Sequence, residues 1–424
     1  MSAALKPAST EEVLDIVAQA AADESPLEIV GHGTKRGLGR PLQAAQLLDL
    51  SALAGITQYE PNELVLTCRA GTPLAEIEAA LQEKNQQLAF EPPDLSPLYG
   101  GTAGAGTIGG VLSCNLAGPR RLKAGAARDH FLGFRAVSGR GEAFQAGGRV
   151  VKNVTGYDLC KLMAGAHGTL AVLTEVTIKV LPAPEKSRTV LIYGLDDSDA
   201  IPAMSRAVNS PHEVSAAAHL PAGIAARSSV DFVASAARPV TAIRIEGPGP
   251  SVEQRCAALR RDLADSGPTE ELHSMRSAIF WREIRDVARL LPDSGRLIWR
   301  LSVPPSSGAQ IVAEITKNTP PPLAGGGGGR GDTATTPAEH YYDWSGGLIW
   351  LALPATDDAS AAAIRATIAR HGGHATLMRA PAATRLSVPV FEPQPAPLAA
   401  LSRRVKASFD PRRILNPGRV ATDL

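Results

Sequence analysis

Clustered cysteines are absent from this 424-residue sequence. Its four cysteines stand far apart, and no two of them form a Cys-x-x-Cys pair; they are Cys68, Cys114, Cys160 and Cys256. Iron–sulfur clusters and structural zinc sites are built from grouped thiolates, so the sequence excludes both kinds of centre. The same scatter argues against a disulfide framework.

A strong charge of either sign is absent as well. The chain has 43 lysines and arginines against 42 aspartates and glutamates, which leaves a formal net charge of +1 at pH 7. This balance gives no electrostatic reason to expect binding to nucleic acid or to an anionic membrane surface.

Long apolar runs are also missing. No stretch of about 18 uninterrupted apolar residues occurs, so no membrane span is predicted. The N-terminal residues lead into an acidic amphipathic helix without the charged and then apolar pattern of an export signal. We therefore expect a cytoplasmic protein that would reach a membrane only peripherally, through partners.

The length of the chain, by contrast, suffices for two or three packed units. Short strands alternate with helices, which predicts an α+β architecture. The prolines of 182–184 are the best linker candidate, so we expect domains over 1–183 and 186–400 and a tail over 401–424. Residues 304–340 include five consecutive glycines and are expected to form a mobile insertion.

Residues 31–39 read GHGTKRGLG and follow a predicted short strand over 27–30. Such glycines expose backbone N–H groups where a ligand can approach closely, which is how protein backbones cradle phosphate. A Rossmann fingerprint does not fit, because the spacing is Gly-x-Gly-x-x-x-Gly and Arg40 and Pro41 offer no helix for a pyrophosphate. A tight turn without a ligand is the alternative for this loop taken alone.

A second glycine-rich loop, GTIGGVLSCNLAGPRR, spans residues 106–121. It combines glycines with the hydroxyls of Thr107 and Ser113 and with two terminal arginines, a set that suits phosphate or another anion. The segment EPPD over 91–94 precedes it. Two such loops in one chain favour ligand binding over two unrelated turns.

Polar residues and glycines recur between 152 and 175. Gly165 and Gly168 precede a predicted long strand and would let the backbone lie against a flat heterocycle such as an isoalloxazine ring. The polar residues Asn153, Tyr157 and Asp158 either contact the same ligand or cap the helix that begins there.

Histidines give a weaker signal. His371 and His374 lie in the motif HGGHAT. They could act as metal ligands or as a base that accepts a substrate hydroxyl proton, and the alternative is that they only shape the loop. No group of acids and histidines at metal spacing accompanies them, so no metal site is predicted.

Together, the motifs VGHGTKRGLG, EPPD, GTIGGVLSCNLAGPRR, ARDHFLG, VVKNVTGYDLCKLMAGAHGTLAVLTEVTIKVLP and DPRRILNPGR resemble the FAD-binding domain of the vanillyl-alcohol oxidase and p-cresol methylhydroxylase superfamily. GPRR and KNVTGYDL resemble one branch especially, the smaller FAD-binding E subunits of bacterial glycolate oxidases. YDWSGGLIW, RHGGHAT and NPGR extend the likeness toward the C-terminus. The resemblance implies an α+β fold: a two-subdomain FAD-binding domain of the p-cresol methylhydroxylase type, then an α+β cap domain.

The same resemblance implies FAD contacts in both glycine-rich loops, in the segment that begins at Gly168, and in the C-terminal tail. The implied residues are Gly31, His32, Gly33, Thr34, Lys35, Thr107, Gly109, Gly110, Ser113, Gly168, Thr169, Val172 and Asn416. The flanking motifs add the cofactor-binding candidates Pro93, Asp94, Asn153, Gly156 and Asp158. Relatives with covalent flavin carry a histidine where this chain has Thr34, so non-covalent FAD is expected.

The implied activity is FAD-dependent oxidation of the CH–OH group of a 2-hydroxy acid such as glycolate, within a complex that also contains a larger flavin subunit and an iron–sulfur subunit. Hydride would pass to the flavin and electrons then to the iron–sulfur partner. His374 is a candidate base, and Arg120 or Arg379 a candidate for holding the carboxylate.

One departure from the family pattern concerns catalysis. The histidine-rich metal and substrate motif of related catalytic branches is reduced here to HGGHAT. A non-catalytic FAD-binding subunit that supports a catalytic sister flavoprotein therefore remains the alternative. In either case the complex would place the chain peripherally at the inner membrane.

Overall fold

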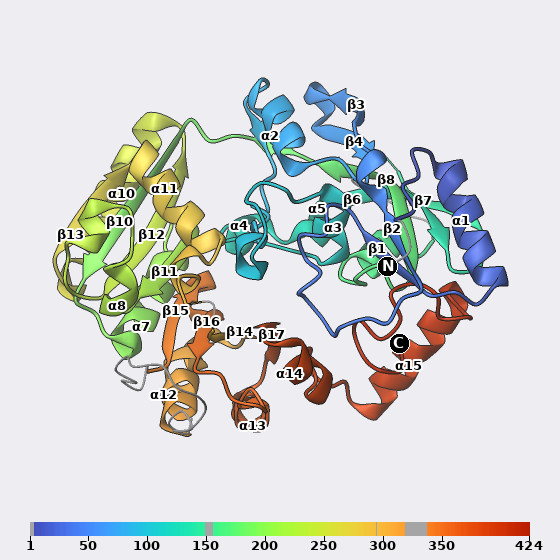
Figure 1. Cartoon of the computed structure of the whole chain (residues 1–424). Coiled ribbons are helices and arrows are strands. Elements are labelled where there is room, and N and C mark those ends of the chain that lie inside the picture. The colour runs from blue at the N-terminus through green and yellow to red at the C-terminus, as the bar shows by residue number, and fades with distance from the viewer. Residues whose placement is uncertain (1–3, 149–155, 294, 319–336) are drawn as a thin grey trace. The chain divides into compact units, whose positions relative to one another are not determined.

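The computed structural model describes residues 4–148, 156–293, 295–318 and 337–424. The chain divides into two compact units, whose elements are labelled in Figure 1. The first unit consists of Met1–Gly118, Ala124–Ala183 and Pro393–Leu424. The second unit consists of Pro119–Lys123 and Pro184–Glu392.

The first unit is built on a five-stranded antiparallel sheet with the order β3-β4-β8-β6-β7. These strands are β3 (Ile56–Glu60), β4 (Val65–Arg69), β6 (Phe131–Ser138), β7 (Ala143–Gly147) and β8 (Ala171–Lys179). Two strand pairs accompany them, the parallel pair β1 (Leu27–Val30) and β2 (Gln46–Asp49) and the antiparallel pair β5 (Gln86–Gln87) and β9 (Leu181–Pro182).

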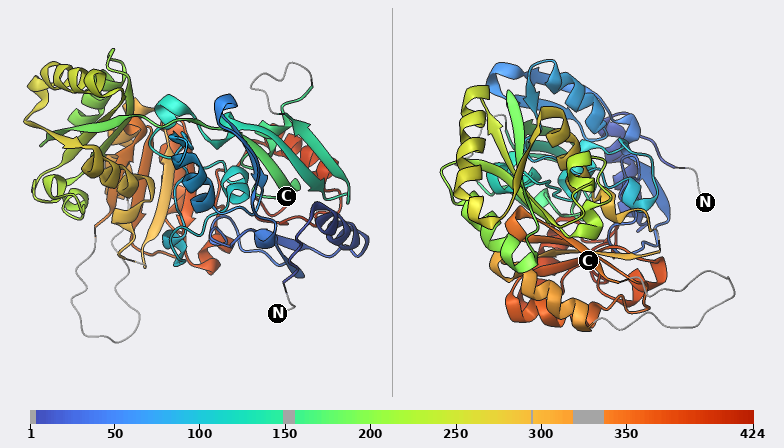
Figure 2. Two further views of the ribbon diagram at one scale, coloured as in Figure 1. Left: turned by 90° about the horizontal axis from the view of Figure 1, so that it is seen from above. Right: turned by 90° about the vertical axis from the view of Figure 1, so that its left-hand side faces the viewer.

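Short helices surround this sheet. They are α1 (Thr10–Ala22), α2 (Leu74–Gln82), α3 (Ile108–Ser113), α5 (Ala127–His130), α6 (Leu159–Met163) and α15 (Ala396–Phe409), with 3-10 turns η1 (Leu50–Ala52), η2 (Pro61–Glu63) and η3 (Pro97–Tyr99). Figure 2 shows α15 in red beside the green strands, where Phe409 and Phe144 of β7 have ring centroids 5.9 Å apart.

Helix α1 illustrates how local sequence fixes an element. The Ser9 hydroxyl accepts the backbone N–H of Glu12 at 3.1 Å and so caps the first turn. Val13 and Val17, one turn apart, are fully buried in a cluster with the β1–β2 pair. The helix therefore needs both its cap and the core beneath it.

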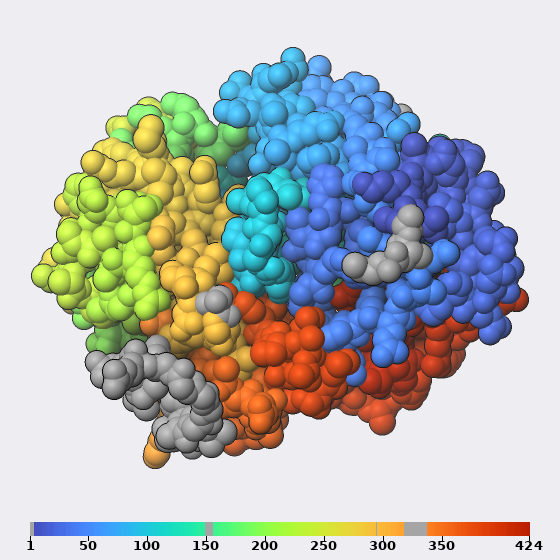
Figure 3. All heavy atoms as spheres, viewed as in Figure 1, coloured from blue at the N-terminus to red at the C-terminus, as the bar shows by residue number. Residues whose placement is uncertain are grey.

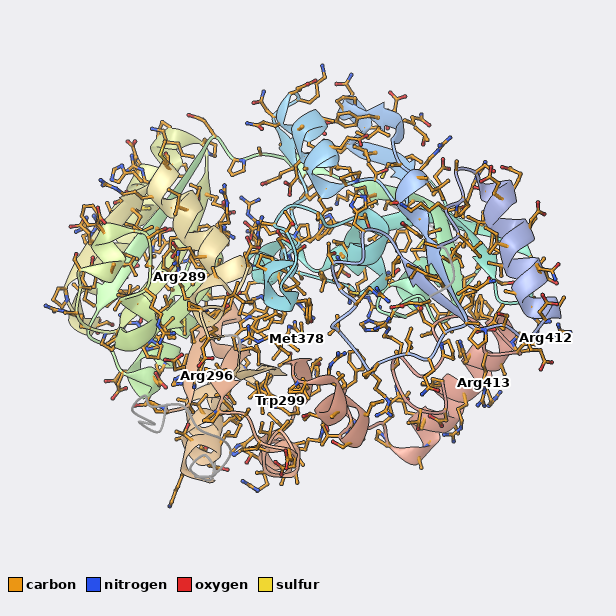
Figure 4. The ribbon with its side chains drawn as sticks, viewed as in Figure 1. Arg289, Arg296, Trp299, Met378, Arg412 and Arg413 are labelled. Carbon is orange, nitrogen blue, oxygen red and sulfur yellow. The ribbon has the colours of Figure 1, made fainter. Side chains whose placement is uncertain are left out.

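The C-terminal tail packs within the same unit. The backbone N–H of Leu27 donates to the Ile414 carbonyl at 2.7 Å. Arg412 donates to the carbonyl of Ala21 at the end of α1. Figure 3 shows the red tail against the blue N-terminal segment, and Figure 4 labels Arg412 beside it. Residues nearly 400 positions apart in the sequence thus share one core.

The second unit is built on an eight-stranded antiparallel sheet with the order β13-β10-β12-β11-β15-β16-β14-β17. Its strands are β10 (Lys186–Tyr193), β11 (Val214–Leu220), β12 (Val240–Gly247), β13 (Thr269–His273), β14 (Leu297–Ser302), β15 (Glu339–Asp343), β16 (Leu348–Leu353) and β17 (His374–Arg379). The edge strands of this sheet are β13 and β17.

One face of that sheet carries the core of the unit. Leu297, Trp299 and Leu301 of β14 alternate toward it, as the two-residue period of a strand requires. Four helices cover this face: α7 (Asp197–Val208), α10 (Gly249–Asp262), α12 (Gly308–Asn318) and α13 (Ala361–His371). The remaining elements are α4 (Arg121–Ala124), α8 (Ala222–Ala225), α9 (Asp231–Ala234), α11 (Ser274–Arg285), α14 (Ala382–Ser387), and the 3-10 turns η4 (Ala264–Ser266), η5 (Ala288–Leu290), η6 (Pro305–Ser307) and η7 (Trp344–Gly346).

The expectation of a mobile insertion over 304–340 is wrong at both ends of this range. Ile311, Val312 and Ile315 of α12 are buried at helical spacing in the core of the second unit. This packing orders a segment that the nearby run of glycines predicted to be irregular. Strand β15 begins at Glu339. Residues 319–336 lie outside the described residues. Residues 119–123 belong to the second unit and residues 393–400 to the first, whereas the expected boundaries placed each of these segments in the other domain.

Candidate functional site

A cavity that is partly open to solvent lies in the first unit. Its lining comes from six separate stretches of the chain: the end of β1 with the loop after it, the first residue of η1, the residue after β4, helix α3 with its two flanking residues, the segment before and within β8, and the C-terminal tail. The lining residues are Ile29, Val30, Gly31, His32, Gly33, Thr34, Lys35, Arg36, Leu38, Leu50, Ala70, Thr107, Gly109, Gly110, Ser113, Cys114, His167, Gly168, Ala171, Leu173, Asn416 and Arg419.

The loop after β1 offers backbone donors to this cavity. Gly33 adopts a positive φ of 69°, a conformation that favours glycine. Within the described part of the chain, the backbone N–H groups of residues 32–35 donate to no protein acceptor. Arg36 N–H, by contrast, turns back to the Gly33 carbonyl at 3.2 Å. Successive unused N–H groups at a cavity suit an anionic oxygen ligand such as phosphate.

Lys35 adds a positive charge at the same place. Its ammonium donates to the Thr34 hydroxyl at 3.0 Å, and within the described residues no carboxylate lies within ion-pair distance of it. Burial lowers the pKa of Lys35, opposed by Cys114 and Asp94. A largely buried cation without a counter-ion is costly by itself, and a bound pyrophosphate would supply the missing charge.

The two glycine loops touch, and glycine permits this. A Cβ on Gly31 would lie 2.4 Å from the Thr107 hydroxyl oxygen, and one on Gly109 would lie 2.7 Å from the Ala70 carbonyl oxygen. Thr107 caps α3, with its hydroxyl accepting the Gly110 N–H at 3.4 Å. Glycine at 31 therefore lets the first loop approach Thr107, and glycine at 109 lets α3 approach the residue after β4.

Asn416 ties the tail to the other wall of the cavity. Its side-chain oxygen accepts the Ile29 N–H at 2.8 Å, and its amide nitrogen donates to the His167 carbonyl at 2.9 Å. A Cβ on Gly168 would lie 2.7 Å from that amide nitrogen. The carboxamide thus joins the β1 strand end to the segment before β8, and both halves of the cavity depend on it.

A family model described as an FAD binding domain matches residues 1–147. The glycolate oxidase subunit GlcE of Escherichia coli strain K12 is 34% identical to this chain over 98% of both chains. The chain belongs to the GlcE family of glycolate oxidase subunits. Its cofactor is FAD, as the matched domain indicates.

Two further comparisons extend this family assignment. The glycolate oxidase subunit GlcD of Bacillus subtilis strain 168 is 31% identical over 45% of this chain and 39% of its own length. The structure of p-cresol methylhydroxylase with substrate bound superposes with a TM-score of 0.67, covering 100% of this chain and 89% of that one at 12% identity. The expected α+β fold of the p-cresol methylhydroxylase type is confirmed. Among the described residues, no helix is long and apolar enough to cross a membrane.

Most of the residues that the sequence nominated for FAD line the cavity of this family member. They are Gly31, His32, Gly33, Thr34, Lys35, Thr107, Gly109, Gly110, Ser113, Gly168 and Asn416. His32, nominated with them, holds the second loop through Nδ1, 3.0 Å from the Ala105 carbonyl oxygen. Their role as FAD contacts stays a prediction.

Other nominated residues lie outside the lining. Asp94 accepts the N–H groups of Ser96 and Gly104, which orders the loop that contains Pro93. Gly156 is exposed at a φ of 88°. Asp158 caps α6 by accepting the Lys161 N–H at 3.1 Å, so the capping alternative describes it.

Two more of these residues belong to the core behind the cavity. Val172 is fully buried and faces the opposite side of β8 from Ala171 and Leu173, which do line the cavity, because neighbouring strand residues alternate. The Thr169 hydroxyl donates a hydrogen bond to the Ala166 carbonyl at 2.6 Å. Asn153 lies outside the described residues.

Sequence reasoning missed several lining residues. Arg419, three positions after Asn416, donates to the Arg36 and Leu38 carbonyls and pairs with Glu28 at 3.0 Å, and so shapes the first loop from behind. The motif NPGR contained this arginine, and its spacing from the nominated asparagine was the available signal. Leu50 and Ala70 carried no such local signal.

The candidate catalytic residues have structural partners in the second unit. Arg120 forms an ion pair with Glu246 of β12, and both side chains are about 10% exposed. Arg379 donates to the carbonyls of Arg296 and Asp293, at 3.1 and 2.5 Å. Both guanidiniums are thus engaged within the protein, and their role as carboxylate ligands stays a prediction.

The histidines of HGGHAT are not brought together. His371 pairs with Glu314 of α12 at 3.0 Å, whereas His374 begins β17 and is exposed. No group of three or more metal-ligating side chains occurs among the residues that the structure describes. The role of His374 as a base stays a prediction.

His167 gives the cavity a pH-dependent stability. Burial lowers its pKa to about 4, and Arg419 adds to this shift. Between the ordinary value of about 6.5 and the folded value, the unfolded chain binds a proton that the folded chain does not, so stability falls as pH falls through this range. We expect urea midpoints of the FAD-free chain to drop less between pH 7 and 5 in a His167→Asn variant. An equal drop in both proteins would contradict this assignment.

Proposed function

We propose that this chain is the FAD-binding subunit of a complex that oxidises a 2-hydroxy acid such as glycolate. Hydride would pass from the substrate to the flavin, and the electrons would then leave to an iron–sulfur partner. The observation that carries the proposal is the cavity in the first unit, with its unused N–H groups and uncompensated Lys35. The full-length similarity to GlcE supports glycolate as the substrate.

The residues of the chain hold the cofactor rather than react with it. Residues 32–35 would donate to the pyrophosphate, and Lys35 would neutralise part of its charge. Thr34 offers a hydroxyl where covalent attachment would need a histidine, so the flavin would be held without a bond to the protein. When bound, FAD supplies the hydride acceptor.

A second candidate function is a flavoprotein subunit that does not itself oxidise substrate. It is favoured by the structural engagement of Arg120, Arg379 and His371, which leaves few groups for chemistry. Anaerobic addition of glycolate to the purified chain separates the two candidates. Bleaching of the visible flavin band supports the first. An unchanged spectrum in the chain, with bleaching only in the assembled complex, supports the second.

We further expect electron transfer to a quinone analogue only in the presence of an iron–sulfur partner. Burial raises the pKa of Cys68, Cys160 and Cys256 to about 12, so these thiols are inert, and they lie apart. Cluster ligation needs about four grouped thiolates. The measurement is glycolate-dependent quinone reduction by the chain alone and by the chain co-purified with its partners. Full activity from the isolated, iron-free chain would contradict the proposed relay.

A further inference from the structure

A pair of arginines meets on one aromatic ring in the second unit. The guanidinium carbon of Arg121 lies 4.4 Å from the ring centroid of Trp344, and that of Arg300 lies 5.0 Å from the same centroid. Trp344 is 5% exposed, so the ring is a fixed platform. The two guanidiniums are therefore held close to one aromatic face.

Arg300 sits on the sheet face opposite the helices. Its neighbours Trp299 and Leu301 in β14 point into the core, and strand alternation places Arg300 on the other side. In register, it is flanked by Thr376 of β17 and Trp350 of β16. Threonine and tryptophan are therefore its cross-strand neighbours on this face of the sheet.

The charge of Arg300 is not matched by an acid at contact distance. Within the described part of the chain, its side chain forms no ion pair and no hydrogen bond. Burial and the like charge of Arg121 lower the pKa of Arg300 to about 10, with Asp343 opposing the shift. The carboxylate of Asp343 is engaged by the Trp344 N–H at 2.7 Å.

His374 belongs to the same patch. Partial desolvation lowers the pKa of this otherwise exposed imidazole, and the positive charges of Arg300 and Arg121 lower it further, whereas Glu392 raises it. Glu392 is itself paired with Arg365 at 2.7 Å. Positive charge thus gathers on one end of this sheet face, with a titratable imidazole beside it.

We propose that Arg300 and Arg121 form a binding site for the carboxylate of a small 2-hydroxy acid, with Trp344 as the platform that holds both guanidiniums. The inference rests on the proposed function for the identity of the acid. A guanidinium presents paired N–H donors that match a carboxylate. His374 and Thr376 would then lie beside the hydroxyl end of a ligand only a few atoms long.

Arginine-specific labelling tests the site directly. The FAD-loaded chain is treated anaerobically with phenylglyoxal, with and without glycolate, and modification is read at each arginine by mass spectrometry. We expect glycolate to protect Arg300 and Arg121. Arg276, which stacks at 4.8 Å on Phe232 in the same unit, is the matched control and should be modified equally in both samples. Absence of protection, or equal protection by inorganic phosphate, would overturn the proposal.

A variant series tests the same site in the assembled complex. We expect Arg300→Gln to raise the KM for glycolate at least about tenfold, because one charge-assisted pair is lost. Arg300→Lys should give an intermediate KM, since it keeps the charge without the fork. Arg276→Gln should leave KM unchanged. FAD content and thermal melting of each variant should equal those of the wild type.

The outcomes separate the two proposals. A complex that oxidises glycolate while Arg300→Gln keeps the wild-type KM would overturn the arginine site and leave the proposed function standing. Glycolate protection of Arg300 and Arg121 in a chain whose complex does not oxidise glycolate would support the site and contradict the proposed function.

Discussion

Replacing Gly110 by valine is expected to abolish FAD binding while the chain stays folded. A Cβ at this position would lie 3.1 Å from Cε and 3.4 Å from Nζ of Lys35, and 3.3 Å from the Thr107 hydroxyl. Valine adds two more carbons in the space where the cofactor phosphates would approach, and it displaces the lysine. Loss of one charge-assisted hydrogen bond costs about 1.5–3 kcal/mol, or about 10- to 100-fold in affinity.

The experiment compares flavin absorbance per chain after dialysis against excess FAD. Gly223→Val is the matched control, because Gly223 is exposed in α8 and nothing lies within 4 Å of an added Cβ. Gly109→Val is a poor choice, since its Cβ meets the rigid Ala70 carbonyl and would disturb the fold. Wild-type flavin occupancy in Gly110→Val would remove the second loop from the cofactor site.

Replacing Lys406 by methionine should cost about 3–5 kcal/mol of the free energy of unfolding of the first unit. The Lys406 ammonium is buried and donates to the Thr169 and Leu415 carbonyls and, at 2.7 Å, to Asp410. Asp410 is fully buried and also accepts the N–H groups of Ile414 and Leu415. The substitution therefore leaves a buried carboxylate without its counter-charge.

The urea midpoint measures this effect, and an exposed pair provides its control. Lys161 and Asp158 are also 2.7 Å apart, but their side chains are 47% and 50% exposed. Lys161→Met should cost at most about 1 kcal/mol. Because Asn416 lies in the same tail, Lys406→Met should also weaken FAD binding. Equal midpoints for the two variants would show that the buried pair does not hold the tail.

Local composition was enough to predict that both glycine-rich loops line one cavity. Close approach of neighbouring groups favours glycine at 31, 109 and 110, and a positive φ favours it at 33. Such glycine clusters are a property of short segments and can be seen in the sequence. The phase of a strand that is buried on both faces, as β8 is, cannot be seen this way. The nomination of Val172 in place of Ala171 and Leu173 follows from this.

Long-range pairing explains the other differences. Arg120 and Arg379 looked available for a substrate because their partners, Glu246 and two backbone carbonyls, lie more than 80 positions away in the chain. Arg300 was not predicted to be a site residue, because it stands in an apolar strand without a motif around it. The same holds for α12, whose buried face was obscured by the glycine run that follows it.

The most direct test of the cofactor site is the visible absorption spectrum of the purified chain, recorded before and after acid precipitation. We expect flavin bands that correspond to a single FAD per chain, and release of the yellow colour into the supernatant, because Thr34 offers no histidine for covalent attachment. A colourless chain that takes up no added FAD would contradict the proposed site, and flavin retained in the pellet would contradict its non-covalent character.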